Sequence, residues 1–227
     1  MIRSAVVFAG AACLLFASDD GKPKEASHTE RLEFPAHGVL HVKNSFGELD
    51  IQGWDEPRVE VTTVKSGPER KTEEVKVTVE RHGDDVTVAT AHPHRLWPPA
   101  PPLSGAHDID LWYHIKVPRN ASVTVEHGVG DVYVANVTGD IRAAVRSGEI
   151  GLRLPPQEQY TIDAKTDLGA IYSDYPGKER GKVWPFARRF VETTTSDAHK
   201  LTLRIGYGDI VIYKMIPSAA PAAANLR

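Results

Sequence analysis

Residues 129–154, VGDVYVANVTGDIRAAVRSGEIGLRL, repeat one short phrase three times: a glycine, an acidic residue and an aliphatic residue that begins an alternating run. Gly130, Gly139 and Gly148 are nine residues apart, which is about one short strand plus a tight corner. Related phrases occur as FGELDI at 46–51, LGAIYS at 168–173 and YGDIVI at 207–212. The repeat predicts structural turns at the following glycines: Gly47, Gly130, Gly139, Gly148, Gly169 and Gly208.

Each part of the phrase has a physical reason. Glycine adopts a positive φ at a corner more readily than any residue with a side chain. The acidic residue suits a turn because it accepts hydrogen bonds from nearby backbone N–H groups. We therefore expect a positive φ at Gly148, and we expect Ile150 and Leu152 to face the core beside Val132 and Val134.

Period-two alternation of apolar and polar residues predicts strands along most of the chain. The predicted strands are 39–44, 48–52, 58–64, 74–80, 85–90, 109–117, 122–127, 131–134, 160–164, 201–205 and 209–213. The chain is predicted to be all-β. The nine-residue spacing favours a right-handed β-solenoid or β-roll of short stacked strands over 105–213, and an ordinary sandwich is the alternative. The N-terminal strands form either a sandwich-like start or wider coils.

The ends of the chain differ in composition from its middle. Residues 1–18 contain Arg3, an apolar run and then small residues, which predicts a signal peptide. The alternatives are a retained anchor, a buried helix, or a lipoprotein cleaved before Cys13. We expect a polar linker at 19–30, one β domain at 31–213 and a disordered Ala/Pro-rich tail at 214–227. Cys13 is the only cysteine, so the predicted mature chain has neither disulfides nor thiol chemistry.

Three segments resemble the bacterial putative-adhesin family, a group of uncharacterised β-solenoid proteins similar to auto-transporter adhesin heads. They are NSFGELDIQGWDEPRVEVTTVK (44–65), VPRNASVTVEHGVGDVYVANVTGDIRAAVRSGEIGLRL (117–154) and LTLRIGYGDIVIY (201–213). The resemblance covers roughly 32–213, and it implies an exported protein that is not an enzyme. The Pro-rich segment at 93–103 and the long interval between Gly169 and Gly208 depart from the family pattern.

The second of these departures contains a basic, aromatic stretch, YPGKERGKVWPFARRF at 175–190. A basic loop with interleaved aromatic rings can hold an anionic or sugar surface by charge and stacking. The alternative is a loop whose aromatic residues cover the core. The candidate ligand-binding residues are Lys178, Arg180, Lys182, Trp184, Arg188 and Arg189. The Pro-rich segment is interpreted as a stiff spacer.

Composition and motifs narrow the function. The net charge of −3 argues against nucleic acid as a partner. We expect no catalytic residues, cofactor, metal or membrane span in the mature chain. The leading hypothesis is an exported binding or structural module of the envelope or cell surface, whose partner is an envelope protein or a surface glycan. The alternatives are a periplasmic sensor or regulatory partner of an envelope-stress system, and a carbohydrate-active enzyme.

Overall fold

The computed structural model describes residues 24–35, 38–91, 109–181, 187–192 and 198–216. The predicted signal peptide, the Pro-rich segment, Lys182, Trp184 and residues 217–227 of the predicted tail lie outside these ranges. The described strands are β1 (Lys24–Glu33), β2 (Val39–Phe46), β3 (Glu48–Trp54), β4 (Arg58–Gly67), β5 (Lys76–His82), β6 (Asp85–Ala91), β7 (Asp110–Pro118), β8 (Ser122–Val129), β9 (Val132–Ala135), β10 (Ile141–Leu154), β11 (Tyr160–Leu168), β12 (Ile171–Ser173), β13 (Lys178–Gly181), β14 (Arg188–Glu192) and β15 (His199–Lys214). One short helix in the described part, α1 (Glu69–Glu74), follows β4.

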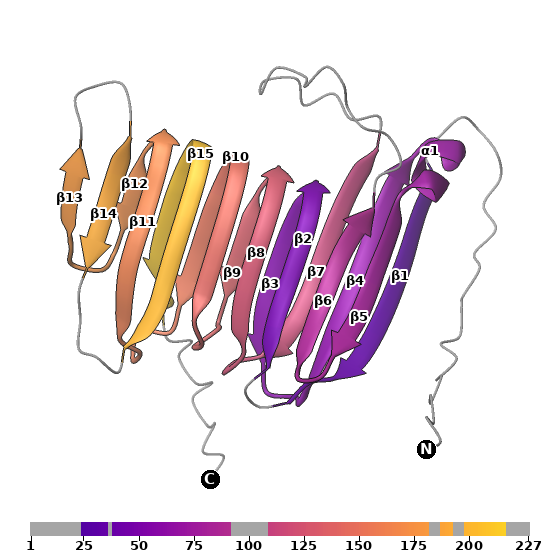
Figure 1. Cartoon of the computed structure of the whole chain (residues 1–227), viewed down its shortest axis with the longest axis horizontal. Helices are drawn as coiled ribbons and strands as arrows, with labels where there is room; N and C mark the ends of the chain where they lie inside the picture. Colours follow the sequence, from indigo (N-terminus) through magenta and orange to yellow (C-terminus); the bar gives the residue numbers. More distant parts are fainter. Residues whose placement is uncertain (1–23, 36–37, 92–108, 182–186, 193–197, 217–227) are drawn as a thin grey trace, which may run out of the picture.

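The strands confirm the all-β class and form one sheet that closes almost into a flattened barrel of two layers. The first layer has the order β5-β6-β2-β8-β10-β15-β11-β14-β13. The second layer has the order β1-β4-β7-β3-β9-β10-β15-β12. Figure 1 shows the strands side by side along the long axis, with β1 at one end and β13 at the other.

A column of glycines marks the edge where the chain crosses from the first layer to the second. The registers align Gly47, Gly130, Gly148, Gly208 and Gly169 on neighbouring parallel strands. Gly148 has a φ of 139°, as the repeat predicted. A Cβ atom on Gly148 would overlap the carbonyl oxygen of Gly130, and one on Gly208 would overlap that of Gly148. These positions therefore need glycine for two reasons, backbone conformation and close stacking. We call this column the arch edge.

Acidic residues after the glycines bind the next strand in the stack. Asp131 Oδ1 accepts a hydrogen bond from the Glu149 backbone N–H at 2.9 Å. Asp209 Oδ1 accepts one from the Ala170 N–H at 2.7 Å. At the opposite edge, Asp140 Oδ1 accepts one from the Lys200 N–H at 2.8 Å. The carboxylates therefore satisfy backbone donors between strands, which is an architectural role.

The inward side chains of both layers form one core. Ile150 and Leu152 are fully buried and align with Val132 and Val134, which confirms their predicted positions. The alternating burial of each strand follows from the period-two pattern. The last aromatic in the described part of the basic segment, Phe190, is also buried.

The structure differs from the sequence predictions at residues 24–30, at Gly139 and at Lys214, which was predicted to begin the disordered tail but is the last residue of β15. Residues 24–30, predicted as linker, belong to β1, whose polar sequence is held by backbone pairing with β4 at the edge of the second layer. Gly139 is not among the glycines with a positive φ; a Cβ atom there would overlap the carbonyl oxygen of Ala121. The strands do not stack in chain order, because β15 lies between β10 and β11. In the N-terminal part, the parallel strands β2 and β3 join the main stack while β4 and β5 pair antiparallel with their neighbours.

Candidate binding face

A row of cations crosses the outer surface of the first layer. Lys165 on β11 is in register with Arg204 on β15 and with Arg189 on β14. Like charges on directly neighbouring strands repel one another, so such a row needs nearby acids to be stable. We call Arg204, Lys165 and Arg189 the basic row.

Asp163 supplies one of these acids. Its carboxylate accepts two hydrogen bonds from Arg189, both 2.9 Å long, and one of 2.7 Å from Arg204. Arg204 also donates to the Asp163 backbone carbonyl at 2.7 Å. Burial raises the pKa of Asp163, but the hydrogen bonds from Arg189 and Arg204 outweigh it and hold that pKa below its ordinary value. Asp163 therefore remains ionised and fixes the two guanidinium groups.

A surface depression of about 280 Å³ lies beside the basic row. Its lining includes three cations, Arg146, Lys165 and Arg204, but only one acid, Asp167, which pairs with Lys165 at 2.7 Å. Small residues, Ala144 and Gly206, line it as well and leave the space open. We call it the basic depression. Its cationic lining suits a small anionic group.

Arg146 is the cation best placed to bind a ligand there. Its side chain is exposed, and among the described residues it makes no hydrogen bond or ion pair. Arg204 and Lys165, in contrast, already have acidic partners. An arginine whose five N–H donors are uncommitted can bind a carboxylate in a bidentate way.

The structure places the residues of the predicted basic loop on an antiparallel hairpin at the end of the first layer. Lys178 and Arg180 lie on β13, and Arg188 and Arg189 lie on β14. The prediction of a loop at 175–190 is therefore wrong for 178–181 and 188–190. The strands were missed because their sequence is highly charged and their positions are fixed by backbone pairing at a sheet end. Lys178, Arg188 and Arg189 are all exposed, and Arg189 is ion-paired with Asp163.

Sequence reasoning missed Arg146, Lys165 and Arg204. Each precedes a repeat glycine by two to four residues and occupies an outward position of an alternating strand. That spacing was a usable signal for a shared face. The three cations meet, however, only because β15 inserts between β10 and β11, and the sequence did not show this order.

The described residues contain neither a group of side chains arranged for a metal ion nor a helix able to cross a membrane. Within 24–35, 38–91, 109–181, 187–192 and 198–216, no group of three His, Cys, Asp or Glu side chains is arranged to hold a metal ion. Over the same ranges, no helix is long and apolar enough to cross a membrane.

The fold is similar to that of a putative cell adhesion protein from Clostridium sporogenes ATCC 15579. The TM-score is 0.56 at 15% sequence identity, and the match covers 86% of this chain and 100% of that one. Two further matches are weaker. A putative adhesin from Bacteroides fragilis NCTC 9343 has a TM-score of 0.30 at 7% identity, and the match covers 85% of this chain and 97% of that one. A putative adhesin from Parabacteroides distasonis ATCC 8503 has a TM-score of 0.25 at 10% identity, and the match covers 85% and 98%. No family model matches the sequence, and no curated protein matches it. The Clostridium match supports the resemblance to adhesin-like proteins at the level of the fold.

Proposed function

We propose that this chain is an exported binding module, not an enzyme, and that it holds a carboxylate-bearing glycan of the envelope or cell surface in the basic depression. The observation that carries the proposal is Arg146, an exposed arginine without a partner among the described residues, next to Lys165 and Arg204. The fold shared with a putative cell adhesion protein is consistent with this role.

The role of the repeat acids supports a binding module over an enzyme. Asp131, Asp209 and Asp140 each accept a backbone hydrogen bond between strands, so these carboxylates already have a structural role. A glycosidase would need two carboxylates facing a bound sugar.

We also propose that the parallel strands wind as a right-handed β-solenoid. In this arrangement β13 and β14 form a hairpin outside the coils, and the chain then rejoins the stack as β15.

A matched pair of arginine variants on one strand tests the binding face. Arg146 and Arg153 are both exposed residues of β10, but Arg146 lies on the first layer and Arg153 on the second. The purified protein is titrated with polygalacturonate oligomers, and neutral dextran oligomers serve as the reference. Arg146→Ala should weaken polygalacturonate binding at least about fivefold, since a charge-assisted hydrogen bond contributes more than a neutral one. Arg153→Ala should leave it unchanged.

Salt separates a specific site from general charge attraction. Binding of polygalacturonate should weaken as ionic strength rises, and Arg146→Ala should flatten that dependence. Equal losses in Arg146→Ala and Arg153→Ala, or a loss of dextran binding in Arg146→Ala as large as the loss of polygalacturonate binding, would contradict the proposal.

A further inference from the structure

A second concave site lies at the edge opposite the glycines. It is a cleft of about 380 Å³, within the size range of small-molecule sites. Two chain segments supply most of its lining: the end of β3 with the turn that follows, and the end of β7 with its turn. Phe34, after β1, and Thr138, between β9 and β10, complete it. Trp54 is in register with Pro118, and the Arg119 N–H donates to the Trp54 carbonyl at 3.0 Å. We call it the Trp54 cleft.

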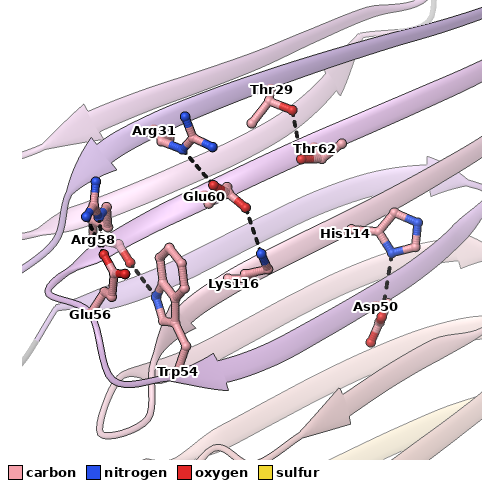
Figure 2. Close-up of polar contacts among 10 residues, drawn as sticks. All are labelled: Thr29, Arg31, Asp50, Trp54, Glu56, Arg58, Glu60, Thr62, His114 and Lys116. Atoms are coloured by element: carbon pink, nitrogen blue, oxygen red, sulfur yellow. Dashed lines mark hydrogen bonds and ion pairs between the residues drawn. The ribbon is translucent and has the colours of Figure 1, made fainter.

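The apolar wall of the cleft consists of rings. Trp54, Pro57, Pro118 and the buried Phe34 line it. The indole of Trp54 is held in place, because its Nε1–H donates to the Arg58 carbonyl at 2.8 Å and the Lys116 ammonium lies 5.4 Å from the ring centroid. Figure 2 shows the indole at the end of β3, with Arg58 on one side and Lys116 on the other. The aromatic surface is therefore oriented before any ligand arrives.

The polar wall of the cleft is rich in hydrogen-bonding groups, but its charges cancel. Asp55 pairs with Arg119 at 2.6 Å, with a second contact of 2.9 Å. Glu56 accepts a hydrogen bond of 2.6 Å from Arg58. Each acid of the lining thus has one arginine partner: Arg119 lines the cleft itself, and Arg58 lies beside the lining. Neither carboxylate is left without a compensating charge. In this respect the Trp54 cleft is the reverse of the basic depression.

Arg119 is held in the cleft by both its side chain and its backbone. Besides its contacts with Asp55, its guanidinium donates to Asn136 Oδ1 at 3.0 Å. Its own backbone carbonyl accepts from Thr138 twice, from the N–H at 2.6 Å and the hydroxyl at 3.0 Å. Groups that are fixed before binding lose little conformational entropy when a ligand is bound.

We propose that the Trp54 cleft is a binding site for a neutral saccharide. A pyranose ring has an apolar C–H face that can lie on the indole, and hydroxyl groups that can donate to Asp55 and Glu56 and accept from Arg119. The cancelled charges favour a neutral sugar over an acidic one, and the volume limits the site to a small part of a longer chain. This inference is independent of the basic depression and goes beyond the proposed function.

The test uses the purified full chain and an array of neutral oligosaccharides, namely glucan, galactan, mannan and N-acetylglucosamine oligomers. Affinity for the best-bound oligomer is then measured by titration calorimetry. Trp54→Ala should weaken this affinity at least about tenfold, because tryptophan is enriched among the residues whose truncation costs the most binding free energy. Trp54→Phe, which keeps an aromatic face, should weaken it less. Trp112→Ala removes another tryptophan, which lies on the outer side of β7 away from the cleft, and should leave binding unchanged.

Two further readouts keep the test decisive. Binding should be insensitive to ionic strength and to Arg146→Ala, so failure at the basic depression would not be mistaken for failure here. If Trp54→Ala does not fold by circular dichroism, Trp54→Phe alone decides. No binding to any neutral oligosaccharide, equal affinity in Trp54→Phe and the unaltered protein, or equal losses in Trp54 and Trp112 variants would overturn the proposal.

Discussion

The two long edges of the flattened barrel perform the same geometric task with different chemistry. At the arch edge, five crossings use glycine, and Asp131 and Asp209 bind the next strand. At the opposite edge, Gly139 and Asp140 repeat this arrangement once, but the other turns differ in sequence and hold the Trp54 cleft with its ion pairs. The repeated sequence thus marks positions where close stacking of the backbones restricts the choice of residue. Sequence variety marks the positions where side chains are available for binding.

The largest effect should come from a side chain at the arch edge. Gly148→Val places a β-branched residue at a φ of 139° and drives its Cβ into the Gly130 carbonyl oxygen. Backbone strain alone costs roughly 1–3 kcal/mol, and the overlap adds to it. We expect the free energy of unfolding in urea to fall by at least about 3 kcal/mol, or the variant not to fold. Near-native stability of Gly148→Val would show that the glycine column is not an architectural requirement.

Burial of a histidine next to the glycine column predicts acid sensitivity. His127 is 5% exposed, and neither ring nitrogen has a partner in hydrogen-bonding geometry among the described residues. Burial lowers its pKa, and the nearby Gly47 and Val129 backbones and Asp131 oppose this only in part. The unfolded chain therefore binds a proton more readily, so the contribution of His127 to stability is lost as pH falls through about 6.5 toward the folded-state pKa.

Urea unfolding of His127→Gln at several pH values measures that contribution. The unaltered protein should lose stability between pH 7 and pH 5, and the variant should lose less because glutamine does not titrate. Parallel pH profiles of the two proteins would exclude His127 as the cause.

The hairpin of β13 and β14 offers a finer comparison, between Arg189 on one strand and Lys178 on the other. Arg189→Ala removes two hydrogen bonds, one to each carboxylate oxygen of Asp163, and leaves Arg204 as the partner of Asp163. We expect a lower midpoint of thermal unfolding for Arg189→Ala than for Lys178→Ala, which keeps those contacts. The difference should shrink in high salt, because both partners are partly exposed. The reverse order would mean that the Asp163 ion pairs do not stabilise the hairpin.

The sequence carried more information about the fold than about its binding sites. The predicted positive φ at Gly148 and the inward positions of Ile150 and Leu152 follow from local pattern alone, and the structure confirms them. β1 escaped prediction because its polar sequence, KEASHTERLE, is stabilised by a partner strand far along the chain. Period-two patterns detect burial, and an edge strand with little burial leaves almost no pattern.

The candidate sites depend on which strands become neighbours. Arg146 and Lys165 share a depression only through the placement of β15 between their strands. Trp54 and Arg119 lie in two of the segments on which the family resemblance rests, yet nothing local in either segment shows that they meet. Long-range pairing decides both sites, and a single sequence does not reveal it.

One measurement tests most directly whether the repeat is architecture: the free energy of unfolding in urea of Asp131→Asn and Asp131→Ala. Asparagine keeps the Oδ1 acceptor for the Glu149 N–H, and alanine removes it. We expect near-native stability for Asp131→Asn and a loss of about 1 kcal/mol for Asp131→Ala, the usual contribution of one hydrogen bond. Equal and large losses in both variants would show that the repeat needs the charge itself, and would contradict the architectural role.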